Sequence, residues 1–144
     1  MRIALEEAQL AYDEGEVPVG AVVVCEDRVV ARAHNRIEQL HDASAHAELL
    51  ALRSAAAELN TWRLTDCVIY VTLEPCAMCM GAMLNFRVGA IAFGAFDETA
   101  GCCISKCELS NGITNITIPY SGGIMAEECS NIIKNFFERR RVCQ

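Results

Sequence analysis

The sequence predicts an α/β fold of three layers, in which a mixed five-stranded sheet lies between layers of helices. Segments with helical and with strand periodicity alternate along the chain, in the order helix, strand, strand, helix, strand, helix, strand, weak strand, helix. A short turn joins the first two strands and indicates antiparallel pairing, whereas helices separate the later strands and indicate parallel pairing. A length of 144 residues is typical of one domain, and we expect residues 1–144 to form it.

The first elements are a helix and a hairpin. Apolar residues at near-helical spacing predict an amphipathic helix over residues 2–14, which Val17-Pro18-Val19-Gly20 then interrupts. Strands are expected from Gly20 to Val24 and from Val29 to His34. The turn Glu26-Asp27-Arg28 lies between them, so the two strands are predicted to form a hairpin.

Helix and strand alternate through the middle of the chain. A polar loop runs through His41-Asp42, and a helix is predicted over residues 45–59, with Ser44 as its N-cap. A strand rich in β-branched residues is expected from Cys67 to Leu73. Because proline suits the first turn of a helix, a short helix is predicted from Pro75 to about Phe86.

The last third of the chain contains the weakest pattern. An apolar strand is predicted from Gly89 to Phe96, residues 98–112 show no clear period, and a strand is expected from Ile113 to Ile118. A long helix is predicted from Ile124 to Arg141. Its apolar residues are expected to face the core or a partner, and they are Ile132, Ile133, Phe136 and Phe137.

Composition excludes several classes of protein. A hydrophobic content of 53% excludes intrinsic disorder. No apolar run approaches the ~18 residues of a membrane span, and Glu6-Glu7 come before an apolar signal region forms. Nine cysteines without such a signal favour a reducing compartment, where clustered cysteines are more often metal ligands or core residues than disulfides. We therefore expect a cytoplasmic protein with no membrane partner.

The net charge of −7 favours solubility and, by itself, argues against a nucleic acid partner. Arg139, Arg140 and Arg141 nevertheless concentrate positive charge in one short tail. A wider basic patch would add scattered residues, namely Arg32, Arg36, Arg53 and Lys106. Since arginines at a helix end also complement the helix dipole, both interpretations of the tail stay open.

Two short segments carry the residue types of a metal centre. In Pro75-Cys76-Ala77-Met78-Cys79 the two cysteines are three residues apart at a predicted helix start, where free N–H groups favour thiolate over thiol. His46, at the start of another helix, offers a third ligand, and three protein ligands leave one position for water, as in catalytic zinc sites. Glu48 is then free to move a proton between that water and a substrate. A Cys-x-x-Cys pair alone is also typical of redox sites.

These motifs resemble those of the cytidine and nucleotide deaminase superfamily, and most closely those of the bacterial tRNA-specific adenosine deaminases. The resemblance implies the cytidine deaminase-like fold and covers most of the chain. Its residues are Glu16 to Val22, Asn35-Arg36, His41-Asp42, Ala45 to Glu48, Val71 to Cys76, Met78-Cys79, Gly81 to Met83, Phe93 to Ala95, Asp97, Gly101 and Phe136-Phe137 with the arginine tail.

The resemblance implies one Zn²⁺ per subunit, held by His46, Cys76 and Cys79, with Glu48 as the proton shuttle. It implies hydrolytic deamination of adenosine to inosine at the wobble position of tRNA, on a base splayed out of the anticodon loop. The residues implied to bind substrate are Asn35 against the base, with the backbone N–H of Ala47 helping to orient it, Asp97 beside the sugar, and Phe137 with the arginine tail against the anticodon stem-loop. Members of the family form homodimers. A candidate pairing surface is the apolar helix face formed by Met78, Met80, Met83 and Leu84, although the same pattern is equally typical of a face buried in the core.

Two departures from the family pattern fall near the expected site. Ala43 stands where the family often has proline, which is expected to loosen the loop before the metal ligand. The segment Cys102-Cys103-Ile104-Ser105-Lys106-Cys107 replaces a stretch rich in glycine and small residues. Its three cysteines could form a second metal or redox site, but their spacing fits no closed zinc pattern, and small residues in a packed loop are the simpler interpretation.

Three functions remain to be distinguished. The first is RNA editing on tRNA. The second is deamination of a free nucleobase or nucleoside, such as guanine or cytidine, which shares the zinc site and suits the acidic charge better. The third is a non-catalytic zinc module for partner binding, which Glu48 argues against, because a structural site has no use for a carboxylate that does not bind the metal.

Overall fold

The computed structural model describes residues 1–111 and 115–143, and its strands form one sheet in the order β2-β1-β3-β4-β5. β1 pairs antiparallel with both β2 and β3, whereas β4 pairs parallel with β3 and β5. The predicted mixed five-stranded sheet is confirmed. The strands are β1 (Gly20–Cys25), β2 (Arg28–His34), β3 (Cys67–Leu73), β4 (Ala90–Ala95) and β5 (Tyr120–Ser121); the helices are α1 (Arg2–Asp13), α2 (Ile37–Leu40), α3 (Ala47–Leu59), α4 (Ala77–Asn85) and α5 (Ala126–Val142).

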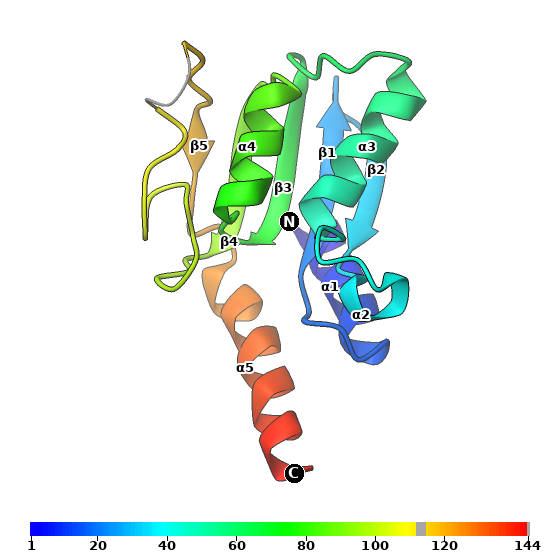
Figure 1. Cartoon of the computed structure of the whole chain (residues 1–144), viewed down its shortest axis with the longest axis vertical. Coiled ribbons are helices and arrows are strands. Elements are labelled where there is room, and N and C mark those ends of the chain that lie inside the picture. The colour runs from blue at the N-terminus through cyan, green and yellow to red at the C-terminus, as the bar shows by residue number, and fades with distance from the viewer. Residues whose placement is uncertain (112–114, 144) are drawn as a thin grey trace.

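Helices cover both faces of the sheet. Helices α3 and α4 lie on one face, towards the viewer in Figure 1, and α1 and α5 lie on the other. Two glycines let the second pair approach closely: a Cβ at Gly20 would lie 2.0 Å from the Ala4 carbonyl oxygen, and one at Gly94 would lie 2.3 Å from Cys129 Sγ. The C-terminal half of α5 extends beyond the ends of the strands (Figure 1).

Most of the predicted elements are present within a few residues of their expected ends. The hairpin turn forms at Glu26 and Asp27, whose φ angles of 49° and 61° are both left-handed. Two left-handed central residues are typical of the type I′ turn, whose twist matches that of paired strands. This turn therefore explains the close antiparallel pairing of β1 and β2.

Three expectations about local structure were wrong. Ser44 is not the N-cap of α3: His46 is, and the Ser44 hydroxyl donates to Asp42 Oδ1 at 2.6 Å instead. The polar loop before α3 contains the short helix α2. The strand expected from Ile113 to Ile118 is not found there: residues 116–118 are not in a strand, and residues 113 and 114 are outside the described residues. The last strand is β5 instead. Parallel pairing with β4, a contact distant in sequence, decides where β5 forms.

The core between the sheet and the α3–α4 layer orients both helices. Met80, Met83 and Leu84 of α4 are buried there, so they belong to the core and not to a free pairing surface. Since α3 and α4 both begin at the same end of the sheet (Figure 1), their first turns lie side by side. Within the described residues, no helix is long and apolar enough to cross a membrane.

Candidate active site

The candidate metal ligands lie at the first turns of α3 and α4. His46 and Cys76 are the N-cap residues, both with extended backbones (φ −73°, ψ 148° and φ −75°, ψ 174°), and neither helix end has a side-chain cap. Each helix therefore points the N–H groups of its first turn and the positive end of its dipole towards the same space. Such an end favours anionic groups, and among them a cysteine thiolate.

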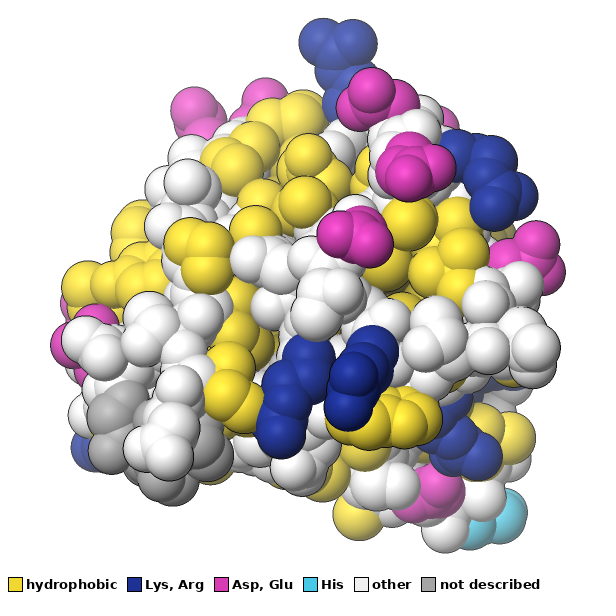
Figure 2. Space-filling view, turned by 90° about the horizontal axis from the view of Figure 1, so that it is seen from above, with side chains coloured by type: hydrophobic (Ala, Val, Ile, Leu, Met, Phe, Trp, Pro, Cys, Tyr) yellow, Lys and Arg dark blue, Asp and Glu magenta, His cyan; other side chains and the backbone are white. Residues whose placement is uncertain are grey.

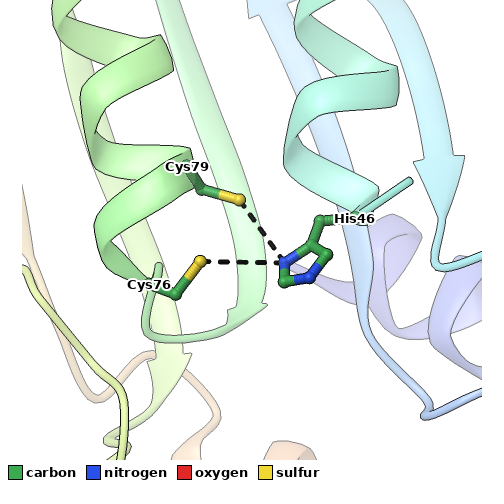
Figure 3. Close-up of side chains that lie close together, drawn as sticks. All are labelled: His46, Cys76 and Cys79. Atoms are coloured by element: carbon green, nitrogen blue, oxygen red, sulfur yellow. Dashed lines mark hydrogen bonds between the residues drawn. The ribbon is translucent and has the colours of Figure 1, made fainter. Parts of the chain in front are cut away.

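His46, Cys76 and Cys79 converge on one point (Figure 3). The Nδ1 atom of His46 lies 3.7 Å from Cys76 Sγ and 3.6 Å from Cys79 Sγ, and the ligand atoms all lie within 4.8 Å of one another. Zinc bonds of about 2.0–2.1 Å to nitrogen and 2.3 Å to sulfur, at tetrahedral angles, require a nitrogen–sulfur distance of about 3.6 Å. One imidazole and two thiols at this spacing fit a zinc ion. In residues 1–111 and 115–143, no other such group is present.

Charge at these three residues also suits a cation. The hydrogen bond from Cys79, together with His46, lowers the pKa of the Cys76 thiol to about 4, against the effect of burial. The same bond to Cys76 raises the pKa of Cys79, and a hydrogen bond with Cys76 raises the pKa of His46. Cys76 is therefore an anion at neutral pH, and a divalent ion could replace the protons that the other two residues share with it.

Glu48 is a buried carboxyl group beside this site. It lies in the first turn of α3 and is 4% exposed, and its Oε2 atom has no hydrogen-bond partner among the described residues. Burial raises the pKa of Glu48 to about 7. A buried oxygen without a hydrogen-bond partner costs free energy of folding, and a catalytic role is one explanation for its presence. A pKa near 7 suits a group that both takes and gives a proton.

Asn35 links the end of β2 to the start of α3. Its side chain is 5% exposed, and its Oδ1 atom accepts a hydrogen bond from the backbone N–H of Ala47 at 2.8 Å. Ala47 is thus placed to hold the Asn35 amide in one orientation. Asn35 also lines the same cavity as His46, Cys76 and Glu48.

The cavity over the site has a volume of about 210 Å³. This is below the ~300–1,000 Å³ of typical sites for drug-sized ligands, so the cavity suits a single planar base better than a whole nucleotide. Asp97 lies at its edge, and its Oδ1 atom accepts the backbone N–H groups of Thr99 and Ala100. The lining residues are Val17, Val19, Asn35, Ile37, His46, Glu48, Leu73, Glu74, Cys76, Asp97 and Ala100.

A wider groove of about 870 Å³ adjoins this cavity. The two share Val17, Leu73 and Asp97 in their walls. Phe137, on α5, is 42% exposed and lines only the groove, together with Phe96. The structure thus places Phe137 near Asp97 but not at the metal ligands.

Glu74 is a buried residue for which the sequence alone predicts no role. It is 2% exposed, lines the cavity and accepts hydrogen bonds from Asp97, Ile104 and Ser105. Although its burial opposes this, the bonds from Ser105, Asp97 and Ile104 lower the pKa of Glu74. A carboxylate at the end of the apolar run before Pro75 was the signal that could have identified it.

The remaining candidates lie outside the site. Cys102 and Cys103 are buried and Cys107 is exposed, which fits small residues in a packed loop, and all nine cysteines are free. The three arginines of the tail lie in the last turn of α5. There Arg139 lies 6.0 Å from the centre of the Tyr12 ring, and Arg140 lies 5.1 Å from that of Phe136.

Comparison with known proteins adds four findings. The family model described as MafB19-like deaminase matches residues 1–141. A Bacillus subtilis (strain 168) protein named tRNA-specific adenosine deaminase is 42% identical over 98% of this chain and 88% of its own length. A solved structure from studies of A-to-I editing by tRNA:A34 deaminases has a TM-score of 0.88 at 38% identity, covering 92% of this chain and 96% of that one. A guanine deaminase from Bacillus subtilis is also similar, with a TM-score of 0.65 at 28% identity, covering 97% and 90%.

Proposed function

Since the chain belongs to the deaminase family that includes the tRNA-specific adenosine deaminases, we propose that it hydrolyses adenosine to inosine at the wobble position of tRNA and releases ammonia. The observation that carries this proposal is the convergence of His46, Cys76 and Cys79 beside the buried carboxyl group of Glu48, whose Oε2 atom has no hydrogen-bond partner among the described residues. We further propose that residues 1–144 form a single catalytic domain.

His46, Cys76 and Cys79 would hold one zinc ion, which supplies a water molecule made nucleophilic at neutral pH. Glu48 takes a proton from that water at Oε2 and delivers it to a ring nitrogen of the base, while the water oxygen bonds to the carbon that bears the amine. Glu48 then takes the second proton of the same oxygen and gives it to the amine, so the C–N bond breaks and ammonia leaves. Asn35, oriented by the N–H of Ala47, contacts the base. The apolar walls of the cavity exclude other water from the reaction.

The two adjoining hollows support a polynucleotide substrate. The cavity suits one base, so the sugar of that nucleotide would lie at its edge beside Asp97. The next nucleotides would then follow the groove, where Phe96 and Phe137 offer aromatic faces for stacking. An enzyme for a free base needs no such second groove, and the larger TM-score of the tRNA:A34 deaminase agrees with this preference.

The distribution of charge reconciles an acidic chain with an RNA substrate. Arg32 and Arg36 form ion pairs with Glu6, Glu7 and Glu14, so they are less available to phosphates. Among the described residues no ion pair involves the tail arginines or Lys134, which lines the groove. At the opposite end of the molecule, Figure 2 shows basic and acidic side chains intermingled. We propose that the stem-loop contacts the groove and α5.

The decisive experiment compares a stem-loop with free bases. We expect inosine and ammonia from an anticodon stem-loop with adenosine at the wobble position, and no ammonia from free adenosine, guanine or cytidine. Phe137→Ala should raise KM for the stem-loop roughly tenfold, because one stacked base contributes ~1–3 kcal/mol. Trp62→Ala is the matched control, since Trp62 is also an exposed aromatic residue and lies beyond the far end of α3. The reverse substrate pattern would establish the free-base function instead.

We also propose that the chain forms a homodimer and acts in the cytoplasm. The support is the family resemblance and the exposed side of α4, where Met78 is 40% exposed beside the half-buried Gly81 and Ala82. Sedimentation should report about twice the subunit mass of 15.7 kDa, and Met78→Glu should shift the protein towards monomer. A wild-type monomer at micromolar concentration would contradict the dimer, and recovery in a membrane fraction would contradict the location.

A further inference from the structure

Glu74 bonds to both ends of the loop formed by residues 97–105, whose middle residues Cys102 and Cys103 are buried in the core. Its Oε1 atom accepts the backbone N–H groups of Ile104 and Ser105, both at 2.8 Å. Its Oε2 atom accepts the N–H of Asp97 at 3.0 Å and the Ser105 hydroxyl at 2.5 Å. One buried carboxylate therefore binds four donors, which come from both ends of residues 97–105.

The backbone of this loop packs closely against the carboxylate. A Cβ at Gly101 would lie 2.5 Å from the carboxyl group of Glu74, so the loop backbone wraps closely around it. Residues 98–100 and 104–108 are exposed, so little apolar burial holds those parts of the loop in place. The loop is also bonded to the start of α4: the Cys102 N–H donates to the Pro75 carbonyl oxygen, and Gly101 forms an isolated β-bridge with Cys76.

The same loop forms one wall of the base cavity. Asp97 and Ala100 line that cavity, and Asp97 also lines the groove. The metal ligands and Glu48, by contrast, lie on α3 and α4 or at their N-caps. A change in the position of Asp97 and Ala100 would thus alter the substrate-binding wall, whereas α3 and α4 would still hold the reacting groups.

We propose that Glu74 is a positioning residue for substrate recognition: through its four hydrogen bonds it sets the distance between Asp97 and the metal ligands, and so the fit of the nucleotide. This inference rests on the proposed function for the identity of the substrate. Because the wall contacts the ground state and the transition state alike, its loss is expected to raise KM more than it lowers kcat.

The test uses the zinc-loaded protein and three variants. Glu74→Ala removes all four acceptor contacts. Glu74→Gln keeps the shape but turns an NH₂ group towards one pair of donors. Ser105→Ala removes a single contact at an exposed residue and should not impair folding. We expect KM for the stem-loop to rise at least ~tenfold in Glu74→Gln, which equals about 1.4 kcal/mol, and roughly threefold in Ser105→Ala, with kcat within about threefold and one zinc per subunit.

Hydrogen exchange tests the same contact without activity. The amides of Asp97, Ile104 and Ser105 should exchange faster in Glu74→Gln than in wild type, and the amides of α3 should not change. Glu108→Gln is the matched control, because Glu108 is an exposed carboxylate close behind the same loop. A double variant with Asp97→Ala should show a smaller effect of Asp97→Ala than in wild type, since Glu74 would already have released that residue.

The outcomes separate this inference from the proposed function. Unchanged exchange at the three amides, or a fall in kcat with unchanged KM, would overturn the positioning role. A wild-type protein that binds zinc but does not deaminate the stem-loop would overturn the proposed function, while the exchange experiment would still decide whether Glu74 holds the loop. If Glu74→Ala does not fold, Glu74→Gln and Ser105→Ala decide the question.

Discussion

Glu48→Gln should reduce deamination by at least ~10²–10⁴-fold while one zinc stays bound to each subunit. This is the range that positioned acid–base groups contribute to catalysis. Glu48 is not part of the His46, Cys76 and Cys79 group, so its replacement leaves the ligand set intact. Glutamine has nearly the same shape, fills the same buried space and cannot take the proton from water. Glu48→Ala should have the same effect on turnover.

Ammonia release under single-turnover conditions, with zinc measured on the same sample, is the readout for Glu48. Glu58→Gln is the matched control, because Glu58 lies on the same helix and forms only an exposed, 3.9 Å ion pair with Arg28. Turnover within about threefold of wild type in Glu48→Gln would remove Glu48 from the mechanism, whereas a wild-type protein that binds zinc and releases no ammonia would favour the non-catalytic zinc module.

Removal of zinc is expected to abolish activity and to lower the melting temperature. A ligand that binds only the folded chain stabilises it by about 4 kcal/mol when present at 1,000 times its Kd. Without the ion, the Cys76 thiolate is left with only the hydrogen bonds from His46 and Cys79 at the starts of α3 and α4. Cys79→Ala should therefore purify with little zinc and with less than roughly 1% of wild-type activity, because the three-ligand set would be incomplete.

Metal analysis and calorimetry on chelated and restored samples measure this effect. Cys107→Ala and Cys143→Ala are the controls, since both cysteines are exposed and neither belongs to the ligand group. Their zinc content and activity should match wild type. A chelated protein that deaminates at the wild-type rate would exclude a metal at His46, Cys76 and Cys79.

The elements that could be predicted from the sequence were those with a strong local period. β3 begins and ends at the predicted residues, and α1, α3 and α4 begin within two residues of the predicted starts. In each of these elements the apolar residues recur with the period of a strand or of a helix along its whole length. Ser44 failed as an N-cap because Asp42 captures its hydroxyl, and the weak strand was misplaced because β5 has only two residues. In both cases a specific partner outweighed local preference.

The sequence by itself determined the chemistry: which side chains can bind a metal, which carboxyl group can move a proton, and which helices begin at those residues. These follow from residue identity and from short spacings along the chain. Only the tertiary structure decided that Asp97 meets Phe137 at a shared groove, that Asn35 is held by Ala47, and that Glu74 binds a loop about 30 residues away. Burial and hydrogen bonding between segments distant in the chain set these contacts, and no local pattern encodes them.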